Sequence, residues 1–205
     1  MFRLFKKKLP QCDELFAKYL SPWYPDKYYR DMTRPDMYVI SGYKGHPLDL
    51  DALQYLSAEQ LLKEKNQISK MAGAALLEYR SILPSQELSL DVLDAVDTFY
   101  DREKIGDLIK TSDPKDFSND YLISVCEFGA MLGKLFEDME EFGWLYSTPY
   151  FNSIIVHRNT GFGITVFDWA VKKFSEYGVD DGFVAKFHAA IAGVKEQETR
   201  NIHGG

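Results

Sequence analysis

Hydrophobic residues recur with a helical period over most of the chain, and this pattern changes to that of strands near the C-terminal third. Ser57, with Gln60 three residues later, has the pattern of a capping box and precedes an apolar stripe. It predicts a helix over residues 57–83. A second apolar stripe begins after Ser89, and serine is a preferred N-cap residue. It predicts a helix over residues 89–109, either continuous or kinked.

The strongest helical pattern covers residues 119–142. Its apolar residues repeat at alternating spacings of four and three, and a neighbouring stripe that includes Gly129 and Gly133 widens the apolar face. Such an apolar helix is typical of the centre of a domain. We expect the two glycines to let another helix approach closely, with Ala72 and Ala75 of the long preceding helix as the contact.

After the central helix the residue pattern predicts β-strands. Residues 144–148 and 152–158 predict two strands, because the second contains three β-branched residues in a row. Asn159-Thr160-Gly161 predicts a turn in which Gly161 has positive φ, and 164–167 predicts the returning strand. Two further helices are predicted close to the C-terminus.

These elements predict an α+β fold that is predominantly α-helical: a helix bundle with a small antiparallel β-hairpin or three-stranded sheet near the C-terminal third. A chain of 205 residues can bury a core large enough to fold without disulfides or metals. We expect a single domain over residues 1–205. Its parts are an irregular, aromatic-rich N-terminal segment (1–48), a helical region (49–142), the small sheet (143–167), C-terminal helices (168–194) and a flexible tail (195–205).

The composition narrows the classes of function. The formal net charge of −7 argues against a nucleic-acid partner, which would require a basic face. No apolar run approaches the ~20 residues that span a bilayer, so stable membrane anchoring is not expected. The first residues are basic but precede no apolar stretch, and the expected location is therefore cytoplasmic. The oligomeric state is left open.

Few residues form a pattern that indicates chemistry. The four histidines and two cysteines lack the spacing of metal ligands, so we expect no metal and no cofactor. His46, followed by Asp49 and Asp51, suggests a base with an orienting acid. The acidic run over residues 137–141 is interpreted as a solvated helix face. Cys126 lies in an apolar run and is expected to be buried.

The most unusual feature is the aromatic segment over residues 19–46, which is mildly cationic and has no helical or strand period. Aromatic residues and arginine often dominate binding energy at protein interfaces. The sequence therefore predicts a binding site. Its residues are Trp23, Tyr24, Tyr28, Tyr29 and Arg30. The competing interpretation is that these rings plug the end of the helix bundle.

Several short motifs follow one another in the second half of the chain: Glu127-Phe-Gly-Ala-Met-Leu-Gly133, Phe142-Gly-Trp144, Thr160-Gly161, Val166-Phe167 and Val171-Lys-Lys-Phe174. Residues 120–175 resemble a group of small uncharacterised bacterial domains in which a Gly-x-x-Leu-Gly helix leads to a Gly-Trp strand and a hairpin. Some such modules resemble immunity or accessory proteins of toxin systems. The resemblance implies an architecture and a bacterial source, and it implies no reaction.

The first functional hypothesis is therefore a non-catalytic, protein-binding protein of the immunity-like or accessory kind, with a partner of unknown identity. The alternative is a small-molecule-binding domain or a hydrolase-type enzyme that uses His46 with the nearby acids.

Overall fold

The computed structural model describes residues 8–24, 32, 34–85, 87–139 and 141–203, and the structural statements below concern that part of the chain. Within it the fold is α+β and mainly helical, as the sequence predicts. The helices are α1 (Cys12–Leu15), α2 (Ala58–Glu78), α3 (Leu90–Phe99), α4 (Arg102–Thr111), α5 (Asp120–Glu137), α6 (Val166–Lys173) and α7 (Phe183–His203). Shorter turns are η1 (Phe16–Leu20), η2 (Ser21–Trp23) and η3 (Tyr150–Asn152).

Side-chain caps fix where the helices begin. At the start of α2 the Ser57 hydroxyl accepts the backbone N–H of Gln60, and the Gln60 side chain accepts the N–H of Ser57. The predicted helix over 89–109 is two helices, because Asp101 accepts the N–H of Lys104 at 2.9 Å and starts α4 anew. Helix α2 ends at Glu78, earlier than predicted.

The sheet has four antiparallel strands in the order β1-β4-β3-β2. They are β1 (Met37–Val39), β2 (Phe142–Leu145), β3 (Ile154–His157) and β4 (Phe162–Ile164). The predicted turn is confirmed, since Gly161 has φ 65°. The prediction of at most three strands was wrong: β1 comes from the segment 1–48 that was expected to be irregular. Three residues are too few to show an alternating pattern.

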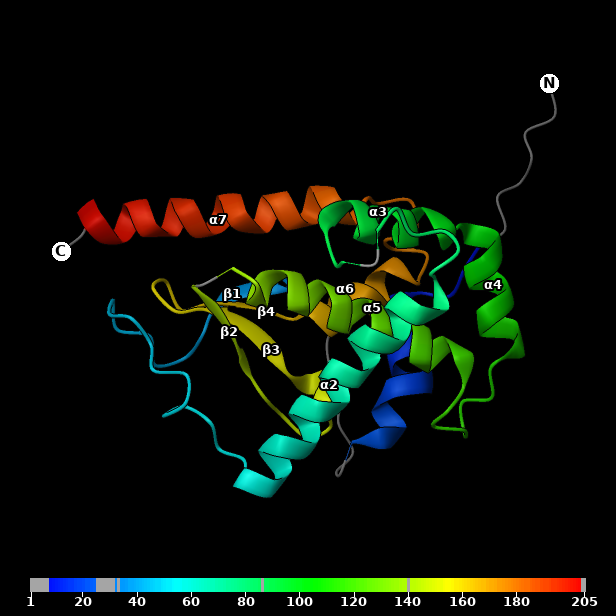
Figure 1. Ribbon diagram of the computed structural model, residues 1–205, viewed down its shortest axis with the longest axis horizontal. Coiled ribbons are helices and arrows are strands. Elements are labelled where there is room, and N and C mark those ends of the chain that lie inside the picture. The colour runs from blue at the N-terminus through cyan, green and yellow to red at the C-terminus, as the bar shows by residue number, and fades with distance from the viewer. Residues whose placement is uncertain (1–7, 25–31, 33, 86, 140, 204–205) are drawn as a thin grey trace.

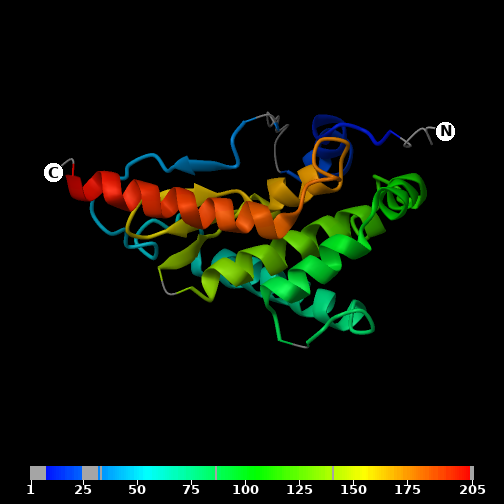
Figure 2. The same ribbon diagram turned by 90° about the horizontal axis from the view of Figure 1, so that it is seen from above.

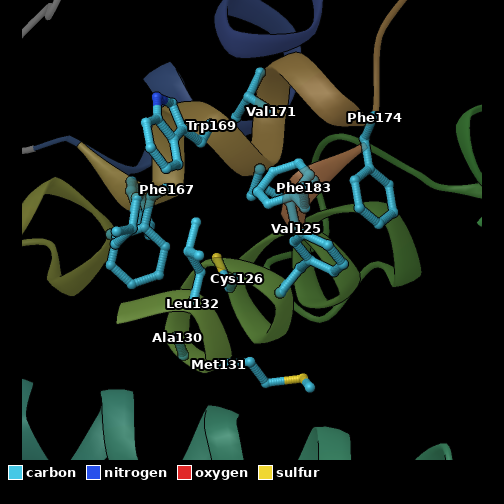
Figure 3. Packing of buried hydrophobic residues seen from close by; sticks show 14 of the residues in the cluster. Val125, Cys126, Ala130, Met131, Leu132, Phe167, Trp169, Val171, Phe174 and Phe183 are labelled. Atoms are coloured by element: carbon cyan, nitrogen blue, oxygen red, sulfur yellow. The ribbon is translucent and has the colours of Figure 1, made fainter. Parts of the chain in front are cut away.

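Helix α5 lies at the centre of the helical part, with α2 packed on one side and α6 on the other (Figure 1). In Figure 3, Val125 and Leu132 extend from α5 towards the α6 side, where Phe167 and Trp169 lie. Met131 extends in the opposite direction, towards α2. The central position of α5 agrees with the burial of most of its side chains.

The glycines of α5 have a different role from the predicted one. A Cβ atom at Gly129 would lie 2.5 Å from Cδ1 of Phe167, and at Gly133 it would overlap the ring of Trp144. The expectation that they face Ala72 and Ala75 was therefore wrong. Helix α2 does pack on α5, but the glycines make room for two aromatic rings from α6 and β2.

Helix α7 runs alongside the sheet (Figure 2) and continues to His203, through most of the predicted flexible tail. Its Gly193 lies near Met37 of β1 and Phe162 of β4. Glu198 lies 3.7 Å from Nε2 of the buried His157, whose pKa is lowered by burial. Among the described residues, no helix is long and apolar enough to cross a membrane.

Candidate binding sites

Trp23, a member of the predicted binding segment, lies at the wall of a pocket of about 350 Å³. Its ring meets the ring of Phe117 edge-on, with centroids 4.8 Å apart, and Phe117 is 43% exposed. The Trp23 Nε1 atom is shielded from solvent and has no hydrogen-bond acceptor among the described residues. A buried donor without an acceptor costs about 1–3 kcal/mol, so this indole N–H needs an explanation.

The pocket lies between the first half of α2, the turn η2, the loop before α5 and the loop that leads into η3. We call it the Trp23 pocket. Its walls are aromatic and apolar on one side and polar on the side of α2. It is lined by Trp23, Lys63, Glu64, Gln67, Phe117, Thr148, Pro149 and Tyr150.

The polar groups of the pocket are held by one another. Glu64 is only 4% exposed, and its Oε1 accepts a hydrogen bond of 3.0 Å from the Thr148 hydroxyl. The Tyr150 hydroxyl lies close enough to the Cys126 thiol and the Gln67 side chain to interact with both, and burial raises the pKa of Tyr150 well above its ordinary value. Burial also raises the pKa of the Cys126 thiol to about 12, so neither group is an activated nucleophile at neutral pH.

The other predicted binding residues have different positions. Tyr24 is buried, where it packs against Phe16 and Phe151, and its hydroxyl lies 3.5 Å from Oδ1 of Asn152. It anchors the segment to the core. Tyr28, Tyr29 and Arg30 lie outside the described residues. Their part in binding stays a prediction.

The His46 hypothesis gains no support from the local geometry. His46 is exposed, and the Asp49 carboxylate accepts the backbone N–H groups of Asp51 and Ala52 at 3.1 and 3.2 Å. Asp49 thereby stabilises its own turn, as short acidic side chains commonly do.

The acidic end of α5 is largely paired with a neighbouring cation. Lys134 lies 3.0 Å from a carboxylate oxygen of Glu137 and 3.0 Å from one of Asp138. Within the described part of the chain, no three His, Cys, Asp or Glu side chains are grouped so that they could hold a metal ion.

A second hollow, of about 580 Å³, lies between α4 and the start of α5. We call it the α4–α5 cleft, and its polar lining consists of Glu78, Tyr100, Lys104, Asp107, Thr111, Asp120 and Ser124. The Tyr100 hydroxyl donates to Oγ of Ser124 at 3.0 Å and is also bonded to the Tyr79 hydroxyl. Two buried hydroxyl groups, those of Tyr100 and Ser124, therefore line the inner wall.

Glu127 lies on α5 one turn beyond Ser124 and is 3% exposed. Its Oε2 has no hydrogen-bond partner among the described residues. Burial, assisted by the charge of Glu78, raises the pKa of Glu127 to about 8. The side chain is therefore mainly a neutral carboxylic acid at pH 7. Strongly shifted acids beside a cleft are candidates for functional groups.

Sequence reasoning did not identify Glu64, Glu127 or Phe117, which lie outside the aromatic segment, as candidate site residues. A usable signal existed for Glu64, because it shares one helix face with Ile68, Ala72 and Ala75. Glu127 likewise stands inside an apolar run. Phe117 stands in a polar loop with no periodic pattern, and only the folded chain brings it to Trp23.

Comparisons of the chain with protein-family models, with curated proteins and with solved structures found no match.

Proposed function

We propose that this chain is a non-catalytic binding protein and that its Trp23 pocket receives an extended, proline-containing segment of a partner protein. The observation that carries the proposal is that the indole N–H of Trp23, a residue of the pocket wall, is buried without an acceptor among the described residues. A backbone carbonyl group of the partner would supply that acceptor.

The chemistry of the walls favours a proline-containing segment. A polyproline II segment has no internal hydrogen bonds, so its carbonyl groups remain available to a donor. Aromatic grooves are the usual receptors for such segments. The rings of Trp23, Phe117 and Tyr150, together with Pro149, offer flat apolar surfaces around the donor. Phe117 is exposed enough to contact a partner directly.

Two further points support binding to a protein. The thiol and phenol groups beside the pocket, Cys126 and Tyr150, stay protonated at neutral pH, which favours recognition over covalent chemistry. The resemblance of residues 120–175 to immunity-like or accessory modules of bacteria also favours a protein partner. We therefore propose that this chain is an immunity-like or accessory protein.

The test is an isothermal titration of the full chain with a synthetic polyproline peptide and with a glycine–serine peptide of equal length. We expect saturable binding of the polyproline peptide alone. Trp23→Phe, which keeps a ring but removes the N–H, should weaken binding about tenfold, or about 1.4 kcal/mol. Phe117→Ala should weaken it similarly.

Leu77→Ala is the matched control, because Leu77 is 72% exposed on α2 and lies outside the Trp23 pocket. It should leave peptide affinity unchanged. Melting temperatures of all three variants separate lost binding from lost folding. Equal affinities of the two peptides, or an unchanged affinity in both Trp23→Phe and Phe117→Ala, would overturn the proposal.

A further inference from the structure

The α4–α5 cleft has acidic groups that the neighbouring cation does not neutralise. Glu78 and Asp120 form no ion pair with the described residues, and Asp107, which has an interaction of its own, also lines the cleft. The ammonium group of Lys104 lies over the ring of Phe99, 3.9 Å from its centroid. Glu78 and Asp120 outnumber the single lysine of the lining, which therefore has a net negative charge without any contribution from Asp107.

We propose that the α4–α5 cleft binds a small organic cation, namely a primary ammonium group attached to an apolar body. The ammonium group would lie between Glu78 and Asp120, and the body would contact Phe99, Leu108 and Ile123, which form the apolar part of the lining. This site is separate from the Trp23 pocket and does not depend on the function proposed for it.

The helix ends around the cleft add to its preference for a cation. Helix α2 ends at Glu78, α3 ends at Phe99 and α4 ends at Thr111, and all three of these residues line the cleft. The C-terminal end of a helix carries partial negative charge from its unpaired carbonyl groups. Three such ends therefore meet at this surface. The opposing positive end of α5 has the carboxylate of Asp120 in its first turn.

The inner wall supplies fixed polar groups, and a buried acid lies behind them. Tyr100 and Ser124 are 4% and 6% exposed, and the hydrogen bond between them fixes both hydroxyl groups. Behind them on the same side of α5 lies Glu127, whose Oε2 has no partner among the described residues. Its carboxyl group is close enough to Glu78 and Tyr100 for their charges to interact. Glu127 does not itself line the cleft, and its unsatisfied oxygen lies behind the hydroxyl groups of the wall.

The apolar walls distinguish an organic cation from a bare ion. Phe99, Leu108 and Ile123 offer no ligand atoms, and the carboxylates that line the cleft are spread over α2, α4 and α5. Burial of an apolar body against these side chains would add a hydrophobic contribution that an inorganic ion cannot gain. An amine with an aromatic or branched aliphatic body fits both parts of the lining.

The experiment is a calorimetric titration of the full chain at pH 7 with 2-phenylethylamine, which is protonated at that pH. The matched probes are 2-phenylethanol, which has the same body without the charge, and ammonium chloride, which has the charge without the body. We expect the amine to bind saturably and at least about tenfold more tightly than either probe. Equal binding of the alcohol and the amine, or no saturable binding of the amine, would overturn the proposal.

Two conservative variants locate the site. Glu78→Gln should weaken amine binding about fivefold or more, since it removes one carboxylate charge from the lining. Glu103→Gln removes an equal charge from the exposed face of α4 outside the cleft and should change the affinity less than about twofold. Trp23→Phe should have no effect on amine binding. A failure of the amine proposal is therefore distinguishable from a failure of the peptide-binding proposal for the Trp23 pocket. Equal effects of the two glutamine variants would show that only general surface charge attracts the amine, which also contradicts the proposal.

Discussion

Gly133 of α5 and Trp144 of β2 are in direct contact: the six-membered ring of the indole occupies the space that a Cβ atom at residue 133 would need. Trp144 is 4% exposed and pairs with Ile155 in the sheet, so its backbone position is fixed. We predict that Gly133→Ala lowers the free energy of unfolding by about 1–3 kcal/mol through overpacking. Urea denaturation followed by circular dichroism measures the change.

Gly73 on α2 provides the matched control. It also lies inside a helix, but no atom lies within 4 Å of the position of its missing Cβ. Gly73→Ala should raise the free energy of unfolding by about 0.5–1 kcal/mol, because alanine is the better helix former. If Gly133→Ala were equally stabilising, Trp144 would not occupy the position described here.

Sequence periodicity was sufficient to predict the fold class and the order of the main elements. The caps at Ser57 and Ser89 and the apolar face of α5 are local signals, and each has its predicted role. Two features could not be predicted because they depend on distant contacts. Strand β1 exists through its pairing with β4, and α7 continues past Val194 where its surface meets the sheet.

The candidate sites were less accessible to sequence reasoning than the fold. The composition of the aromatic segment indicated Trp23, but Phe117 and Tyr150 reach it from segments far along the chain. The same composition did not distinguish Trp23 at a pocket from Tyr24 in the core, although the two residues are adjacent. Glu78 and Asp120 belong to different helices, and only their packing forms the acidic lining of the cleft.

The turn between β3 and β4 gives a second stability prediction. Gly161 has φ 65°, and a Cβ atom there would lie 2.5 Å from Cγ of Tyr43. Gly161→Ala should lower the free energy of unfolding by about 1–2 kcal/mol for the backbone alone, with a further cost for moving the ring. Gly45→Ala isolates the backbone part, because Gly45 has φ 82° and open space around it. If denaturation showed a larger loss of unfolding free energy for Gly45→Ala than for Gly161→Ala, the predicted cost of moving the Tyr43 ring would be wrong.

A buried ion pair connects α6 to α3. Nζ of Lys173 lies 2.7 Å from Oδ1 of Asp97, and both side chains are nearly inaccessible to solvent. We predict that Asp97→Asn destabilises the protein by about 3–5 kcal/mol, because it leaves a buried ammonium group without its counter-charge. Thermal unfolding gives the comparison.

The exposed pair between Lys134 and Glu137 is the control for that measurement, with a separation of 3.0 Å and much greater exposure. Glu137→Gln should change the free energy of unfolding by less than about 0.5 kcal/mol, since solvent screens this pair. Similar losses in the two variants would mean that burial does not decide the strength of the Lys173–Asp97 interaction.

The last prediction concerns how stability depends on pH through Glu127. Its pKa is about 8 in the folded protein, against an ordinary value of 4.5, so the folded state holds this proton more tightly than the unfolded state does. As pH rises from 4.5 to about 8, the unfolded chain ionises Glu127 while the folded chain does not, and stability falls by about 1.4 kcal/mol per pH unit.

Glu127→Gln removes the titrating carboxyl group, so proton binding at residue 127 no longer differs between the folded and unfolded states. The variant should gain stability over the parent as pH rises, by about 3 kcal/mol at pH 7, and the difference should level off above about pH 8. Urea denaturation of the parent and the variant at pH 5, 7 and 8.5 measures the difference. A gain for Glu127→Gln that is the same at all three pH values would show that its carboxyl group titrates normally, and the buried, neutral state described for Glu127 would then be wrong.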